Sequence, residues 1–228
     1  MELVRNCQLF VSVSHTLLAE YHDHPNTMVI PHGVPSALLN KERMLSAAVE
    51  KKIIMAGSVS YRTDIELLHA VAVKLPEYTL KIAGPLVLNE FSISDHKWWK
   101  SLLHLPNVKY TGVLSFVELA GEIYTSCVGI AAYKQNDPGN SISYLKIMQY
   151  LACGKPVVTT PLIEYSSTRF SEMISVALSK EEFVADVERM VSNEQSEADK
   201  LKRSSFASEF KYSLLLGLIA RNINSEWP

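Results

Sequence analysis

Four short apolar segments, each followed by residues with helical spacing, constrain the fold of this chain more than any other feature. They cover residues 52–57, 78–84, 107–112 and 127–132. The first three end in Gly57, Gly84 and Gly112, and the fourth is followed directly by Tyr133. Nearly continuous apolar strands that alternate with helices are typical of a parallel sheet covered on both faces. Because crossovers between parallel strands are right-handed, we predict a doubly wound, Rossmann-like α/β domain.

The segments between and after these strands predict the covering helices. Asp64 and Ser115 are placed to cap two of them, and a third is expected from Asp95 to Leu105. Two further strands are expected at 156–158 and 173–178. Amphipathic helices are expected at 180–191, 197–210 and 210–224. The chain thus supplies enough strands and helices for one sizeable domain.

The carboxyl ends of the predicted strands form the expected ligand edge. In an open parallel sheet, ligands bind in the crevice outside these ends, and a glycine there leaves room for a ligand. We therefore expect Gly57, Gly84, Gly112 and Tyr133 to lie along that crevice.

The stretch from residue 136 to 161 combines a polar loop, a helix and a strand. Lys146 and Gln149 lie three residues apart, so both are expected on one polar face, where replacing them should barely affect folding. Unpaired amides of Ser141, Ile142 and Ser143 at the expected helix start, with Lys146 nearby, can hold a phosphate. The alternative is a surface helix with two solvated polar side chains.

Composition excludes several classes of protein. The chain has 228 residues and a formal net charge of −2, which argues against binding to nucleic acid through phosphate contacts. Its three cysteines have no metal-ligand spacing and fit a reducing compartment, and the pair His22 and His24 lacks a third ligand. No signal peptide or membrane-spanning run is visible, so we expect a cytoplasmic protein without a metal.

Residues 146–158 read Lys-Ile-Met-Gln-Tyr-Leu-Ala-Cys-Gly-Lys-Pro-Val-Val. This sequence resembles the nucleotide-sugar-binding segment of glycosyltransferases with the two-domain GT-B fold, of the group 1 or family 4-like type. The resemblance implies a hexosyltransferase of polysaccharide biosynthesis that takes a nucleotide diphosphate sugar as donor and a glycan or lipid-linked acceptor. It implies no cofactor and no metal, and it leaves room for peripheral membrane contact.

The chain departs from the family pattern at several positions. Gln149 and Ser141 stand where the family has glutamates, the first of which holds the ribose hydroxyls. Ser58 replaces an arginine of the phosphate clamp, and Arg62 is one residue away from the position of its lysine. The candidate binding residues are Gly57, Ser58, Arg62, Gly84, Gly112, Tyr133, Ser141, Ile142, Ser143, Lys146 and Gln149. No residue is a convincing general base, so the catalytic residues stay unassigned.

Residues before the main domain form one further strand-helix-strand unit, with strands near 9–14 and 27–30 and a helix over 15–24. The unit resembles the last part of the first, acceptor-binding GT-B domain, most of which is then missing. We therefore expect a remnant of that domain at 1–36, the nucleotide-sugar domain at 37–210, and at 211–228 a helix that packs back on the first domain. The apolar cluster at 214–219 would then be exposed and favour self-association through both ends.

Two functions are open at this point. The first is the donor-binding domain of a glycosyltransferase, incomplete as an isolated chain because the chemistry of this fold occurs between two domains. The second is a non-catalytic binding or interaction module, a glycosyltransferase-like domain that has lost turnover and acts through a partner chain. Ser141, Gln149 and the altered phosphate clamp favour it. A dinucleotide enzyme is disfavoured, because no Gly-x-Gly-x-x-Gly follows a predicted strand.

Overall fold

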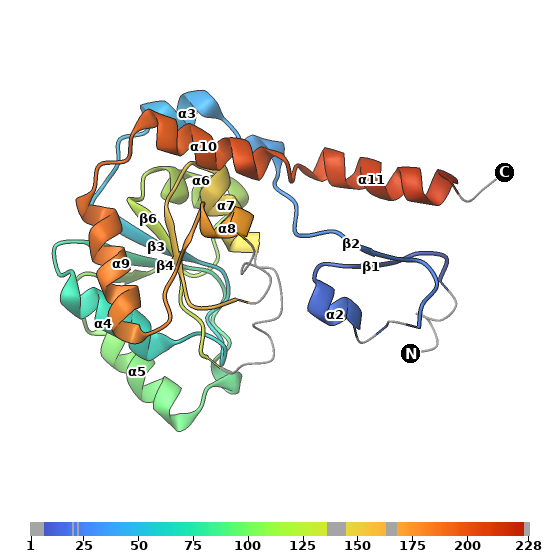
Figure 1. The fold of residues 1–228 in the computed structure, drawn as a ribbon. Helices are drawn as coiled ribbons and strands as arrows, with labels where there is room; N and C mark the ends of the chain where they lie inside the picture. Colours follow the sequence, from blue (N-terminus) through green and yellow to red (C-terminus); the bar gives the residue numbers. More distant parts are fainter. Residues whose placement is uncertain (1–6, 20, 22, 136–144, 163–167, 226–228) are drawn as a thin grey trace.

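The computed structural model describes residues 7–19, 21, 23–135, 145–162 and 168–225 (Figure 1). Within these residues, six parallel strands form the main sheet in the order β5-β4-β3-β6-β7-β8. They are β3 (Lys52–Ala56), β4 (Thr79–Ala83), β5 (Val108–Tyr110), β6 (Val128–Ala131), β7 (Val157–Thr159) and β8 (Ser175–Val176). The first of these strands in sequence lies in the middle and the chain winds outward on both sides, which confirms the doubly wound α/β prediction.

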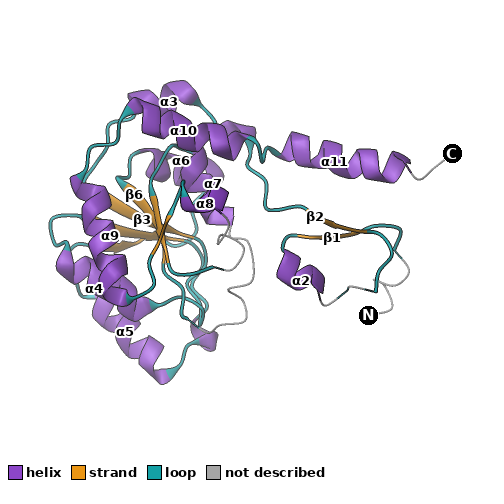
Figure 2. Cartoon of the chain, in the orientation of Figure 1, coloured by secondary structure: helices purple, strands orange, loops and turns teal. Residues whose placement is uncertain are grey.

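Helices cover both faces of this sheet (Figure 2). On one face lie α4 (Ile65–Lys74), α5 (Ile93–Leu103) and α9 (Lys180–Ser192). On the other lie α3 (Lys41–Ser46), α6 (Phe116–Tyr124), α7 (Leu145–Ala152) and α10 (Glu197–Ser208). Short helical turns at η1 (Ser36–Leu38), η2 (Leu88–Glu90) and α8 (Thr168–Ser171) complete the description of this domain.

The central strand β3 shows how the two cores are built. Ile53 and Met55 enter the core under α4, α5 and α9, whereas Ile54 and Ala56 enter the opposite one. Successive side chains of a strand point to opposite faces, so a strand buried on both sides must be apolar throughout. Burying one large apolar side chain stabilises the fold by about 1.5 to 3 kcal/mol.

Helix starts follow local capping chemistry, as expected at Asp64 and Ser115, whose side chains accept hydrogen bonds from Leu67 N–H and Glu118 N–H. The expected start of α5 at Asp95 was wrong. Ser92 accepts from the N–H of Asp95, and the Asp95 carboxylate accepts from the N–H of Ser92, so the helix begins at Ile93. A reciprocal capping box satisfies two backbone donors and therefore determines the start.

The N-terminal unit pairs β1 (Phe10–Ser12) with β2 (Thr27–Val29) in parallel, with α2 (His15–Ala19) between them. The expected helix over 15–24 was too long, since α2 ends at Ala19. Two turns follow it: Tyr21 N–H donates to Leu18 O (2.8 Å) and His24 N–H to Tyr21 O (3.0 Å). The proline that follows His24 disfavours a helical conformation there.

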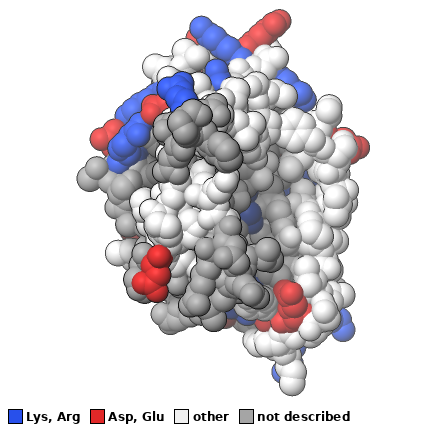
Figure 3. Space-filling model, turned by 90° about the vertical axis from the view of Figure 1, so that its right-hand side faces the viewer, with Lys and Arg blue, Asp and Glu red and all other residues white. Residues whose placement is uncertain are grey.

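The last helix, α11 (Tyr212–Ser225), leaves the main domain and runs beside the N-terminal unit (Figure 1). Its Asn222 Nδ2 lies 3.9 Å from the Sδ of Met28, a residue of β2. Leu215 is buried, but several apolar side chains of α11 are exposed: Leu214 (53%), Leu216 (62%), Leu218 (47%) and Ile223 (43%). Figure 3 views the molecule from this side, and uncharged or undescribed residues cover most of the face. No helix in the described part of the chain has the length and apolar content needed to span a membrane.

Candidate nucleotide-sugar site

Three glycines at the carboxyl ends of β3, β4 and β5 meet, as the sequence predicted. Gly57 N–H donates to Ala83 O (2.8 Å), and Gly84 N–H donates to Gly112 O (2.8 Å). Gly84 has φ +151°, and a Cβ there would lie 2.2 Å from Gly57 O. Only glycine fits this position, so backbone alone forms the sheet edge here.

Lys146, in the first turn of α7, lies against this edge. A Cβ added to Gly57 would stand 2.9 Å from Lys146 Cε and 3.1 Å from its Nζ. The ammonium lies 4.8 Å from the ring centroid of Tyr133, within the range of a cation–π contact. No Asp or Glu among the described residues forms an ion pair with it, and only 8% of the residue is exposed. Burial therefore lowers the pKa of Lys146 to about 7.

The expectation that Lys146 lies on a solvated polar face was wrong. Residues 146–148 and 150–152 are all buried, because α7 packs between the sheet and α10. Tyr150 reaches into the core, where its hydroxyl accepts a hydrogen bond from Ala56 N–H (2.7 Å). Gln149 is half-buried, and none of the described residues forms a hydrogen bond with its side chain. Lys146 is thus a buried cation rather than a surface residue.

The loops after β3 and β6 hold each other next to Lys146. Thr63 and Tyr133 form an antiparallel bridge, and Lys134 N–H donates to Arg62 O (2.9 Å). Tyr133 N–H also donates to Thr160 Oγ1 (3.0 Å), at the end of β7. These backbone contacts fix the Tyr133 ring beside the Lys146 ammonium. The sequence did not predict this hydrogen bond of Thr160, because Tyr133 lies 27 residues away from it in sequence.

Ser58 and Arg62 lie in the same β3–α4 loop. Ser58 is exposed, and its carbonyl accepts from Thr63 Oγ1 (3.5 Å). The Arg62 guanidinium lies over the Tyr61 ring, 5.5 Å from the centroid, and its Nε donates to the Tyr61 hydroxyl (3.0 Å). The structure thus places Arg62 against its neighbour Tyr61.

Asp95, at the start of α5, forms an ion pair with Lys134, and its Oδ1 lies 2.6 Å from the Lys134 Nζ. The sequence did not predict this ion pair either. Burial raises the pKa of Asp95, but hydrogen bonds from Lys134 and Ser92 outweigh burial and hold the pKa below its usual value. The pair connects α5 with the β6 loop, and it neutralises the Lys134 ammonium. The predicted Ser141, Ile142 and Ser143 lie outside the described residues.

Comparisons with known proteins bear on the fold of the chain. No protein-family model matches the chain. A 106-residue segment is 32% identical to TuaH of Bacillus subtilis (strain 168), whose name assigns it to teichuronic acid biosynthesis as a glycosyltransferase. This segment is 46% of the present chain and 25% of TuaH.

Solved structures match over almost the whole chain. HepE from Anabaena, solved with UDP-glucose, has a TM-score of 0.73 at 14% identity, and 98% of this chain covers 66% of HepE. Sucrose-phosphate synthase from Thermosynechococcus elongatus has a TM-score of 0.69 at 16% identity, with 99% of this chain and 61% of that one covered. The chain therefore spans less than two thirds of the length of these proteins. Over that span it has the fold of the GT-B glycosyltransferases and resembles them.

Proposed function

We propose that the carboxyl edge of the main sheet binds the diphosphate of a nucleotide-sugar donor, and that the chain is the donor half of a hexosyltransferase. The observation that carries this proposal is the buried Lys146 ammonium beside Gly57, with no carboxylate partner among the described residues. A buried cation is costly unless an anion pairs with it. HepE, which shares the fold, has been solved with UDP and with UDP-glucose.

The chemistry of glycosyl transfer fits this cation. When the bond between the sugar and the diphosphate breaks, negative charge develops on the departing phosphate oxygen. An ammonium held next to that oxygen in a water-poor site stabilises the developing charge. Lys146 also lies in the first turn of α7, where the helix dipole adds positive potential. The proposal uses no metal ion and no cofactor, since these groups supply the charge.

The acceptor in this proposal is a glycan or a lipid-linked sugar, and the reaction belongs to polysaccharide biosynthesis. TuaH, with its teichuronic acid assignment, supports the acceptor class. The location proposed is cytoplasmic, with peripheral membrane contact when the acceptor is lipid-linked. The thiols of Cys127 and Cys153, which form no disulfide among the described residues, support a reducing compartment.

Titration calorimetry with UDP, GDP and ADP tests the donor site. We expect one of them to bind, and Lys146→Met to weaken binding by about 1.5 to 3 kcal/mol, because a charge-assisted hydrogen bond is lost. Methionine is apolar and of similar length, so the fold should remain. Lys97→Met, at an exposed site on α5, is the matched control and should bind normally. Absence of binding by all three nucleotides would overturn the proposal.

A second candidate function is a nucleotide-binding module without turnover. The stacking of Arg62 on Tyr61 favours it, because this places the only arginine of the β3–α4 loop against a neighbour. Incubating the chain with a UDP-sugar and a lipid-linked acceptor separates the two functions. A module binds the nucleotide but releases no UDP, whereas a transferase releases it in proportion to the acceptor.

A further inference from the structure

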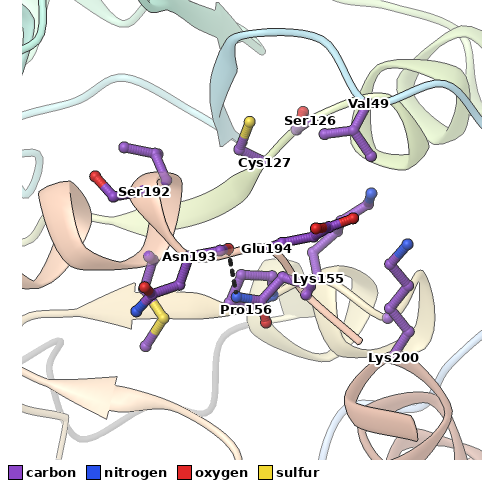
Figure 4. Close-up of a pocket in the computed structure, with 13 residues that line it drawn as sticks. Val49, Ser126, Cys127, Lys155, Pro156, Ser192, Asn193, Glu194 and Lys200 are labelled. Atoms are coloured by element: carbon purple, nitrogen blue, oxygen red, sulfur yellow. Dashed lines mark hydrogen bonds between the residues drawn. The ribbon is translucent and has the colours of Figure 1, made fainter. Parts of the chain in front are cut away.

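A cavity of about 310 Å³ lies at the amino-terminal edge of the sheet, opposite the candidate nucleotide-sugar site (Figure 4). Val49, Cys127 and Pro156 line it from the segments that enter β3, β6 and β7. The connection between α9 and α10, residues 192–195, closes another side. Its volume is at the lower end of the range for small-molecule sites. Since parallel strands run from this edge to the other, the cavity is separate from the nucleotide-sugar site.

Lys155 supplies a buried positive charge to this cavity. Only 3% of the residue is exposed, and no described Asp or Glu forms an ion pair with its ammonium. Burial lowers the pKa of Lys155 to about 8, and the nearby charge of Lys200 acts in the same direction. Figure 4 shows Lys155 and Lys200 approaching the cavity from the same side.

The other cations near Lys155 are already engaged. The ammonium of Lys52 lies 2.6 Å from Glu122 and 3.3 Å from Glu50. The guanidinium of Arg203 donates to the carbonyl of Gly154 (3.1 Å) and to the Gln195 side chain. Lys200, like Lys155, has no side-chain partner among the described residues. These two ammonium groups are therefore the ones that can receive an anion.

The lining also defines the rest of the ligand. Glu194 contributes one carboxylate against the two ammonium groups, which leaves a single positive charge. Val49, Pro156 and Met190 provide apolar surface, and Ser126 and Asn193 provide polar groups. We propose that this cavity binds a small organic monocarboxylate, whose carboxylate pairs with Lys155 and Lys200 while its apolar part contacts Pro156 and Met190.

Sodium benzoate is a suitable probe, because it combines one carboxylate with a small apolar ring. Thermal melting at pH 7 in benzoate should give a higher midpoint than melting in sodium chloride at the same ionic strength. Lys155→Met should melt higher than the wild type without any ligand, since it removes an unpaired buried charge. The same variant should bind benzoate at least tenfold more weakly by calorimetry. Lys97→Met, the exposed control, should match the wild type in both measurements.

Three outcomes would overturn the proposal: no benzoate effect beyond that of chloride, a benzoate effect that persists in Lys155→Met, or protection by inorganic phosphate alone. The last would assign the cavity to phosphate esters instead. Benzoate should raise the melting midpoint of Lys146→Met as much as that of the wild type, and UDP should not displace benzoate. These two controls separate the cavity from the donor site, so that either proposal can fail without the other.

Discussion

Lys146 fills the space into which a side chain on Gly57 would point, with its Cε 2.9 Å and its Nζ 3.1 Å from the position of a Cβ. Gly57 also has φ +101°, a conformation that other residues adopt with strain. Gly57→Ala should therefore displace the lysine, weaken nucleotide binding and lower the free energy of unfolding by about 1 to 3 kcal/mol. Urea denaturation and calorimetry measure the two effects.

Gly112→Ala is the matched control for stability. Its φ of +68° is also left-handed, but a Cβ there would meet no atom within 4 Å. The expected loss is the backbone strain alone, about 1 kcal/mol. Equal losses for the two variants would show that the contact with Lys146 has no energetic weight.

Stability should depend on pH through Lys146. Its pKa is about 7 in the folded chain and about 10.5 when unfolded, so the unfolded chain binds more protons between these values. The free energy of unfolding therefore rises with pH between these two values. Below pH 7 the destabilisation caused by the charged Lys146 has reached its full size. Lys146→Met should be more stable than the wild type at pH 6 by about 3 to 5 kcal/mol, a difference that shrinks towards pH 10. Denaturation at pH 6, 8 and 9.5 measures it, and a constant difference would contradict the assigned pKa.

Nucleotide binding should be accompanied by proton uptake. At pH 8 the empty site holds Lys146 mostly neutral, because its pKa is about 7. A diphosphate next to the amine favours the charged form and raises this pKa, so binding should take up nearly one proton per nucleotide, on the order of 0.8. Calorimetry in buffers with different ionisation enthalpies reports the uptake, which should fall at pH 6. Binding without proton uptake at pH 8 would place the diphosphate away from Lys146.

Gln149 tests the position of the ribose. Gln149→Ala should cost about 1 kcal/mol of nucleotide affinity, the usual value for a neutral hydrogen bond. Gln149→Glu should hold or increase affinity, since a carboxylate accepts hydrogen bonds from two hydroxyls more strongly than an amide does. Calorimetry with the nucleotide that binds the wild type checks both. Unchanged affinity in the alanine variant would mean that the ribose lies elsewhere.

The exposed leucines of α11 should promote self-association. Leu214 and Leu218 lie one turn apart, and replacing both with glutamine keeps helix propensity while removing apolar surface. Sedimentation velocity at rising concentration should show association of the wild type and less of it in the double variant. A wild type that stays monomeric at high concentration would contradict this prediction.

The main sheet and the meeting of its glycines could be predicted because their signals are local. An apolar strand that ends in glycine is visible within six residues, and the capping side chains of Asp64 and Ser115 lie next to the helices they begin. Burial of Lys146 could not be predicted in this way. It depends on contacts with Gly57 and Tyr133, which follow other strands of the sheet, and on the packing of α7 between that sheet and α10. A polar spacing of three shows which side chains share a face, but not what packs against that face.

The same reason applies to the cavity around Lys155 and to the pair of Asp95 with Lys134. The cavity is lined by residues from Val49 to Lys200, and the ion pair spans 39 positions. Contacts of this kind depend on the order of the strands in the sheet, which no local sequence pattern shows. The start of α5 had a different cause, since both Ser92 and Asp95 are residues that cap helices, and only the reciprocal hydrogen bonds distinguish them.

The chain crosses between the main domain and the N-terminal unit twice, and the two crossings are bonded to each other. Val34 N–H donates to Phe210 O (2.7 Å), Tyr212 N–H donates to Val34 O (3.3 Å), and the Tyr212 ring lies against Gly33. Torsion about either crossing alone would break these bonds. A double connection of this kind removes the rotational freedom that a single tether would allow and leaves bending about one shared axis. We therefore expect the pair β1–β2 and helix α11 to change orientation together relative to the main domain.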